Sequence, residues 1–265
     1  MTMARSAHDE ALSVYSQYQS LVSAVIAMPP VPSEFESIVL LSGELPSKDG
    51  DLINLLLASA HPLNNSGCEV LRPLWAEEAM HRIHGFMRLI GARSRRGSPT
   101  RQNPIAAQVE DFAARDLAAK FRELETGAER AVLPCSTVLG DVVSDLGTLF
   151  GCPASIVLET TIERVSLPGY KRRALVLAAC ELLCNALLHA FPGHQTGLIE
   201  VGLTFQGRRS ARLRVADNGI GFGDTPPNLT CGVAAGLADL LEADLAYTRA
   251  AGWTIAEICF PARGA

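Results

Sequence analysis

Hydrophobic residues recur at helical spacing near the start of the chain. Residues 8–28 place apolar side chains three and four positions apart, which predicts an amphipathic helix. The run Met28-Pro-Pro-Val-Pro32 ends this helix, because proline lacks a backbone donor and restricts the residue before it. Residues 33–66 are interpreted as a connector with one short helix at about 51–59. Residues 1–66 thus form an N-terminal helical and connector segment, for which the pattern indicates no role.

Two longer helices are expected next, at about 68–96 and 105–129, on either side of a turn-forming cluster at 97–104. The second helix has an apolar side made of Val109, Phe112, Leu117, Phe121 and Leu124. Residues 67–130 are therefore predicted to form a helical hairpin. Because a lone hairpin cannot bury both of its faces well, we expect a second copy of the chain to complete a dimeric four-helix bundle.

Strands alternate with helices over residues 131–265. Residues 198–205 alternate cleanly between apolar and polar, which predicts a strand, and 211–216 is its returning hairpin partner. The remaining predicted elements are strands at 155–161, 244–249 and 253–260, with helices at 138–149, 171–191 and 232–241. These elements favour an α/β sandwich, a mixed sheet with helices on one face. The chain as a whole is thus predicted to be of the α+β class.

Composition and charge exclude several classes of protein. Hydrophobic residues make up 48% of the 265 residues and charged residues 19%, enough for a packed core and unlike a disordered chain. The net charge is −5, so no overall basic field favours nucleic acid as a partner. The seven cysteines include no Cys-x-x-Cys pair, which is typical of reduced thiols. The polar start and the lack of a long apolar run predict a cytoplasmic protein without a membrane span.

A glycine-rich turn, Asp217-Asn-Gly-Ile-Gly-Phe222, directly follows a predicted strand. Its glycines allow the backbone to approach a ligand closely, and the carboxylate of Asp217 can accept a hydrogen bond from an exocyclic amine such as that of adenine. A tight turn at a strand end, with no ligand, explains the same residues about equally well.

The preceding helix carries polar side chains on an otherwise apolar segment. Glu181, Asn185 and His189 are four residues apart and share one helix face. Such groups are costly to bury unless something polar meets them. Asn185 suits magnesium, which takes oxygen ligands from few side chains plus phosphates, and Glu181 is placed to accept a proton from a nucleophile. A satisfied interior amide and a capping or core histidine are the alternatives for Asn185 and His189 taken alone.

These two segments together resemble a known family. The run Glu181–Phe191 looks like the asparagine box of the GHKL ATPases, and Val215–Phe222 looks like their first glycine box. The resemblance implies ATP and Mg²⁺ as ligands, with Asp217 on the adenine amine, Asn185 on the metal and Glu181 as catalytic acid or base. It further implies that the nucleotide site is lined by Gly219, Gly221, His189 and Gly232, the last from a second glycine box at 230–237.

Upstream, Glu77–Ile90 resembles the phosphoacceptor helix of HWE-type and related histidine kinases, which carry a His-Arg pair. At about 100° per residue, the apolar positions of this helix lie opposite His81, which is therefore predicted to face solvent beside Glu77, Glu78, Arg88 and Arg95. An imidazole nitrogen there is able to attack a phosphoryl group. His84 is the second choice of acceptor, and an ordinary surface histidine is the alternative without the downstream domain.

The chain departs from the family pattern at several positions. His84-Gly85 follows the His-Arg pair, Leu188 stands where a phosphate-binding lysine often lies, and the second glycine box reads Thr230-Cys-Gly-Val-Ala-Ala-Gly-Leu237. The lid between Phe222 and Gly232 is only nine residues long. Fewer backbone amides and one cation less would hold a triphosphate less well. An arginine run at 82–101 is interpreted as a solvated face, with a dock for a receiver domain as the alternative.

The leading hypothesis is a two-component protein-histidine kinase. It would form a homodimer, phosphorylate itself on His81 from ATP, and pass the phosphoryl group to an aspartate in the receiver domain of a response regulator. A phosphotransfer adaptor with a sandwich that no longer uses ATP is the main alternative. A serine kinase of the anti-sigma type, built on the same sandwich, is a third hypothesis, which the histidine hairpin disfavours.

Overall fold

The computed structural model describes residues 72–95, 104–126, 132–150, 156–192, 196–222 and 232–262. The N-terminal segment 1–66, the turn at 97–103 and the lid at 223–231 lie outside these residues, and so do the predictions made for them. The described helices are α4 (Arg72–Arg95), α5 (Pro104–Thr126), α6 (Ser136–Phe150), α7 (Gly169–His189) and α8 (Val233–Leu240).

Five strands form a mixed sheet in the order β2-β4-β5-β7-β6. The strands β2 and β4 are parallel, and every other neighbouring pair is antiparallel. Two three-residue strands, β1 and β3, pair separately. The bounds are β1 (Val132–Pro134), β2 (Ile156–Ile162), β3 (Ser166–Pro168), β4 (Gly197–Phe205), β5 (Ser210–Asp217), β6 (Leu245–Ala250) and β7 (Trp253–Pro261).

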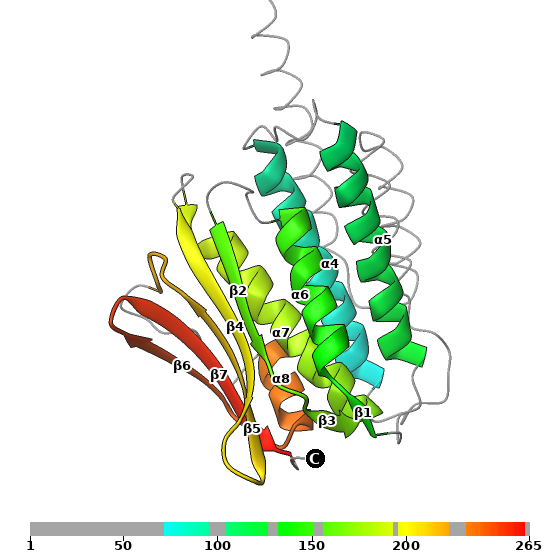
Figure 1. Ribbon diagram of the computed structural model, residues 1–265, viewed down its shortest axis with the longest axis vertical. Helices are drawn as coiled ribbons and strands as arrows, with labels where there is room; N and C mark the ends of the chain where they lie inside the picture. The colour runs from blue at the N-terminus through cyan, green and yellow to red at the C-terminus, as the bar shows by residue number, and fades with distance from the viewer. Residues whose placement is uncertain are drawn as a thin grey trace, which may run out of the picture.

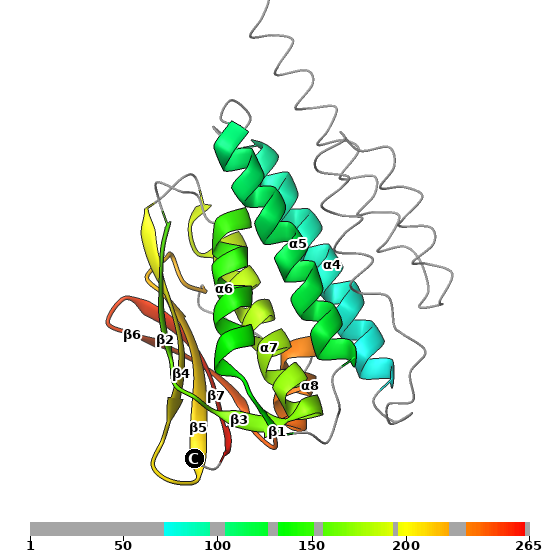
Figure 2. The same ribbon diagram turned by 45° about the vertical axis from the view of Figure 1, so that its right-hand side comes forward.

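The elements are stacked in three layers (Figures 1 and 2). The five-stranded sheet forms one layer, and α6, α7 and α8 cover one of its faces. The hairpin helices α4 and α5 lie on the far side of these helices, away from the sheet. The helical layer thus has apolar neighbours on both sides, which explains why α7 is buried on nearly all of its faces.

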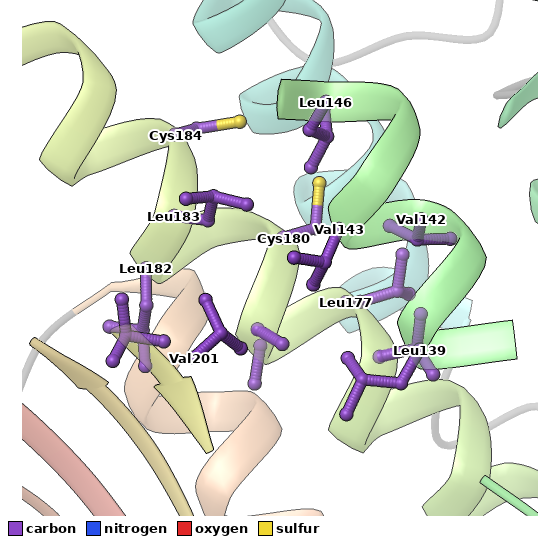
Figure 3. Packing of buried hydrophobic residues seen from close by; sticks show 14 of the residues in the cluster. Leu139, Val142, Val143, Leu146, Leu177, Cys180, Leu182, Leu183, Cys184 and Val201 are labelled. Atoms are coloured by element: carbon purple, nitrogen blue, oxygen red, sulfur yellow. The ribbon is translucent and has the colours of Figure 1, made fainter. Parts of the chain in front are cut away.

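The core follows from the alternation seen in the strands. Ile199, Val201 and Leu203 of β4 point toward the helices and are fully buried. The opposite face of the sheet is polar, with Arg214 of β5 paired to Glu200 at 2.5 Å. Figure 3 shows the side chains of α6 interleaved with those of α7 at the centre of this core; the labelled ones include Leu139, Val143 and Leu146 of α6 and Leu177, Cys180 and Leu183 of α7.

The structure confirms the predicted α+β architecture. Each predicted helix and strand within the described residues is present, with ends that differ by at most four residues. The sequence analysis missed the small β1–β3 sheet, because three residues are too few to show a period. Within the described residues, no helix is long and apolar enough to cross a membrane. The described cysteines that are free thiols are Cys135, Cys180, Cys184 and Cys259.

The predicted apolar side of α5 is only partly correct. Leu117, Phe121 and Leu124 are buried, but Val109 and Phe112 are 52% and 73% exposed. The hairpin buries its inner face against α6 and α7 of its own chain, which a hairpin considered alone could not reveal, and this contact involves mainly the C-terminal half of α5. A four-helix bundle with a second copy remains a prediction, and the exposed end of α5 is where such a copy has apolar surface to cover.

Candidate functional site

The polar face predicted on α7 is present in the structure. The side chain of Glu181 is 13% exposed, Asn185 is half-buried, and His189 at the end of the helix is exposed. Asn185 donates a hydrogen bond from Nδ2 to Glu181 Oε1 at 2.8 Å. This hydrogen bond uses the Nδ2 of Asn185 and leaves its Oδ1 outside the contact. It also holds the Glu181 carboxylate against α7.

His81 reaches the same carboxylate from the hairpin. Its Nε2 lies 2.9 Å from Glu181 Oε1, and its side chain remains 51% exposed. The hydrogen bond to Glu181 raises the pKa of His81, with burial acting in the opposite direction. Glu181 is therefore shared between a candidate nucleophile on α4 and a candidate metal ligand on α7. All three residues stand out in the sequence, but no local pattern indicates that His81 and Glu181 touch.

The helices α4 and α7 run side by side in the same direction. The guanidinium of Arg173 lies 4.2 Å from the centre of the Trp75 ring near the start of both helices. Arg88 Nη2 lies 3.2 Å from His189 Nε2 near the end of α7. Burial, with the nearby Arg88 charge adding to it, lowers the pKa of His189, so the neutral ring accepts this hydrogen bond. Contacts before and after His81 thus fix its position along α7.

A buried ion pair on α4 corrects two predictions, the exposed position of Glu78 and the solvated position of Arg82, the first residue of the arginine run. Glu78, predicted to share the exposed face with His81, is 3% exposed, and its carboxylate accepts a 2.8 Å hydrogen bond from Arg82 Nε. Arg82 also stacks 4.2 Å from the centre of the Phe121 ring, so it holds Glu78 on the side of α4 that faces α5.

A second carboxyl group and a small cavity lie beside this pair. Burial raises the pKa of Glu125 to about 7, although the charge of Arg82 opposes the shift. A cavity of about 10 Å³ lies between this pair and Glu181, large enough for about one water molecule.

The second candidate acceptor, His84, takes no part in the contact with Glu181. Its Nε2 is buried without a hydrogen-bond partner among the described residues. Burial lowers the pKa of His84, and the neighbouring His81 adds to the effect. His84 is thus a neutral ring held one turn away from the cluster on α7, and the geometry favours His81.

The glycine turn places Asp217 at the end of β5, where it is 8% exposed. Its Oδ1 accepts a 3.0 Å hydrogen bond from the backbone of Gly219. Burial raises the pKa of Asp217, although the Gly219 N–H and the hydroxyl of Thr254 both favour the charged form. Thr254 lies opposite Asp217 in the register of β5 and β7, a position that no local motif marks.

The turn is attached to the C-terminal end of α7. The backbone N–H of Ile220 donates to Ala190 O at 2.9 Å, and a Cβ on Gly219 would lie only 2.2 Å from that same oxygen. Ala190 immediately follows His189 in the chain. The glycine at 219 therefore serves a close approach between turn and helix, which is a structural reason for glycine distinct from the predicted contact with a nucleotide.

Two further glycines of the predicted site adopt backbone conformations with positive φ, which other residues rarely adopt. Gly221 has a φ of 72°, and a Cβ there would lie 2.9 Å from the Arg249 guanidinium, which donates to the Ile220 carbonyl. Gly232 has a φ of 119° before the first turn of α8, and no described residue lies within 4 Å of where its Cβ would be. This space and the N–H groups at the start of α8 suit an anion.

An aromatic pair lies next to the turn. The Phe222 and Tyr247 rings meet edge to face with centres 6.1 Å apart. Burial raises the pKa of Tyr247 to about 12, and the charge of Glu181 adds to the shift. The aromatic pair and Asp217 thus lie at the turn that is attached to the end of α7.

The residues of this region fit a nucleotide and a magnesium ion. Asn185 offers an amide oxygen, and magnesium completes its shell with phosphates and water rather than with a protein cage. The described residues contain no group of three or more His, Cys, Asp or Glu side chains arranged for a metal. Asp217 is a buried carboxylate acceptor at the end of β5, which suits an adenine amine.

Comparison with known proteins finds a family match over most of the sandwich. Residues 153–253 match the family described as the histidine kinase-like ATPase domain. The chain is 25% identical over 195 residues to blue-light-activated histidine kinase 2 of Erythrobacter litoralis (strain HTCC2594), which corresponds to 69% of this chain and 56% of that protein. The chain thus spans a little over half the length of this relative.

A solved structure extends the likeness to the hairpin. The histidine kinase domain of the Erythrobacter litoralis EL346 blue-light activated histidine kinase superposes with a TM-score of 0.51 at 21% identity. The match covers 82% of this chain and 94% of that domain. Since 82% is more than the sandwich alone, the shared fold includes residues outside the ATPase domain.

Proposed function

Because residues 153–253 form a histidine kinase-like ATPase domain, and the chain has the fold of a histidine kinase domain, we propose that it is a two-component protein-histidine kinase that uses ATP to phosphorylate its own His81. The phosphoryl group then passes to an aspartate in the receiver domain of a response regulator. The hairpin 67–130 carries the acceptor histidine, and the sandwich 131–265 carries the nucleotide.

The observation that supports this most directly is the 2.9 Å contact between His81 Nε2 and Glu181 Oε1. A histidine that attacks a phosphoryl group must lose its ring proton, and a carboxylate at hydrogen-bond distance is able to take it. A phosphotransfer adaptor would need His81 but neither Glu181 nor Asn185. The contact between the acceptor and the ATPase domain therefore favours the kinase.

The other residues of the site have separate roles in the proposal. Asp217 accepts a hydrogen bond from the adenine amine, and Asn185 presents its amide oxygen to magnesium. Magnesium, when bound, neutralises charge on the phosphates and orients them. Gly219 and Gly221 give the turn the shape that brings its backbone to the nucleotide, and Gly232 leaves space before the first turn of α8. His189 borders the same site.

The test is incubation with γ-labelled ATP and magnesium, comparing the wild type with His81→Gln and Asn185→Ala. We expect label that is stable in alkali and lost in acid, absent from His81→Gln, and reduced at least tenfold in Asn185→Ala. His84→Gln is the matched control, since it changes the same residue type one turn away on α4, and it should keep the label. Label that persists in His81→Gln, or a wild type that takes no label, would contradict the proposal.

A further inference from the structure

The acceptor histidine and the carboxylate beside it belong to one chain. His81 of α4 meets Glu181 of α7 at 2.9 Å, with the Trp75–Arg173 and Arg88–His189 contacts before and after it. We propose that the phosphoryl group is transferred in cis, from the ATP bound by a chain to His81 of that same chain. This inference rests on the proposed function and specifies its substrate, the chain's own hairpin.

A continuous core holds the hairpin in this position. Phe86 of α4 stacks on Phe150 of α6 with ring centres 5.8 Å apart, and it also meets Phe121 of α5 at 6.1 Å. All three rings are buried, and the apolar residues of hairpin and sandwich form one cluster. Transfer to a different chain would require separating these rings and exposing them to water, which is unfavourable. Transfer in cis needs no such separation.

The connection between hairpin and sandwich is short as well. Residues 127–131 separate the end of α5 from the start of β1, and a five-residue link spans at most about 20 Å even when fully extended. Ion pairs strengthen the attachment: Lys120 Nζ lies 2.6 Å from Asp141 Oδ2, and Arg172 Nη2 lies 2.6 Å from Glu123 Oε1. The short link and these ion pairs favour packing of each hairpin against the sandwich that follows it in the same chain.

The transfer step balances without any additional reactant. His81 Nε2 gives its proton to Glu181 Oε1, and its electron pair forms an N–P bond to the γ-phosphorus of ATP. The bond from that phosphorus to the β,γ-bridging oxygen breaks, and ADP leaves with its electron pair. Each turnover converts one ATP and one histidine of the same chain into ADP and phosphohistidine, with one proton released. A homodimer, if it forms, then carries two independent reactions.

Complementation between two inactive variants tests the inference. His81→Gln, which lacks the acceptor, and Asn185→Ala, which lacks the proposed metal ligand, are co-expressed with different tags and purified together, so that any mixed dimer is present. In cis, neither chain can be labelled, and the mixture should carry no more label than the two variants alone. Wild type diluted a hundredfold should label with an unchanged first-order rate constant.

The outcomes separate the inference from the proposed function. Label on the Asn185→Ala chain in the mixture, or a wild-type rate constant that falls on dilution, overturns transfer in cis and leaves the kinase intact. A wild type without label overturns the proposed function, and transfer in cis with it. Circular dichroism of both variants shows whether they are folded, and a variant that is unfolded is replaced by Glu181→Gln for the ATPase domain or His81→Asn for the acceptor.

Discussion

The environment of His81 is determined by a residue 100 positions further along the chain. From the sequence, His81 is a solvent-facing imidazole on an amphipathic helix, and it does remain half exposed. Its chemistry nevertheless depends on Glu181, because a hydrogen-bonded carboxylate both stabilises the protonated ring and offers a destination for the proton.

The first prediction concerns the titration of His81. Because the hydrogen bond to Glu181 raises its pKa, His81 should hold its proton to a higher pH than an ordinary histidine, whose pKa is 6.5. Autophosphorylation should therefore increase as the pH rises through the raised pKa of His81. The stability contributed by the contact is fully present below pH 6.5 and is lost as the pH rises through the raised pKa. NMR titration of the six histidines, with His81 assigned from His81→Gln, measures the shift.

The matched variants for this titration are Glu181→Gln and Glu77→Gln. The first removes the largest cause of the shift and should lower the pKa of His81, since burial then dominates. The second removes the smallest of the carboxylate effects on this pKa and should change it much less. An unchanged pKa in Glu181→Gln would mean that the two side chains do not meet in solution.

At the scale of elements, α4 depends on a charged pair that its periodicity does not reveal. Glu78 and Arg82 are four residues apart, a spacing that usually indicates an exposed helix pair. Here the side chains are only 3% and 4% exposed, because α5 covers them with the ring of Phe121. The pair therefore lies at the junction of the two hairpin helices and α7.

The second prediction is the cost of removing one member of this pair. Arg82→Met leaves the Glu78 carboxylate buried without its partner and should lower the free energy of unfolding by about 3–5 kcal/mol. The double variant Glu78→Leu with Arg82→Met leaves no buried charge there and should recover most of that loss. Urea denaturation at pH 7 measures both.

A pair of the same spacing on α5 provides the control. Arg115 and Asp111 are linked at 2.6 Å but are 70% and 59% exposed. Arg115→Met should change the free energy of unfolding by less than about 1 kcal/mol. If Arg82→Met lowered the free energy of unfolding as little as Arg115→Met, the side chains of Glu78 and Arg82 would be exposed to water in solution, which would contradict their burial in the structure.

At the scale of the whole molecule, hairpin and sandwich share one core. The buried apolar residues of α4 and α5 join those of α6, α7, α8 and the sheet in a single cluster. A protein built as a separate hairpin and sandwich would unfold in two steps, whereas a shared core couples the two parts.

The third prediction uses the two tryptophans, which report on opposite layers. Trp75 lies on α4 and Trp253 begins β7. Two single-tryptophan proteins are made by Trp253→Phe and Trp75→Phe. After correction for any change in stability that circular dichroism detects, the unfolding transition followed by tryptophan fluorescence should coincide in each with the transition followed by far-ultraviolet circular dichroism. A Trp75 transition at clearly lower denaturant would show that the hairpin detaches first, which would also weaken the case for transfer in cis.

Most of the fold follows from local patterns. Periods of 3.6 and 2 residues, interrupted by proline and glycine, predict nearly every described element, because the side of an element that faces the core is repeated along its own sequence. The chemistry-bearing residues of α7 and of the glycine turn are equally visible, since polar groups on an apolar helix and glycines after a strand stand out locally. The β1–β3 pair was missed because it has no such repeat.

What the sequence by itself determined is therefore the set of elements and the residue types of the site. The tertiary structure alone decided that Glu78 is buried, that Val109 and Phe112 stay exposed, and that His81 touches Glu181. The physical reason is that a helix has several faces, and its local hydrophobic period does not indicate which neighbouring element covers each face. That choice depends on how residues far apart in the chain pack together, and here it places the candidate nucleophile against the ATPase domain of its own chain.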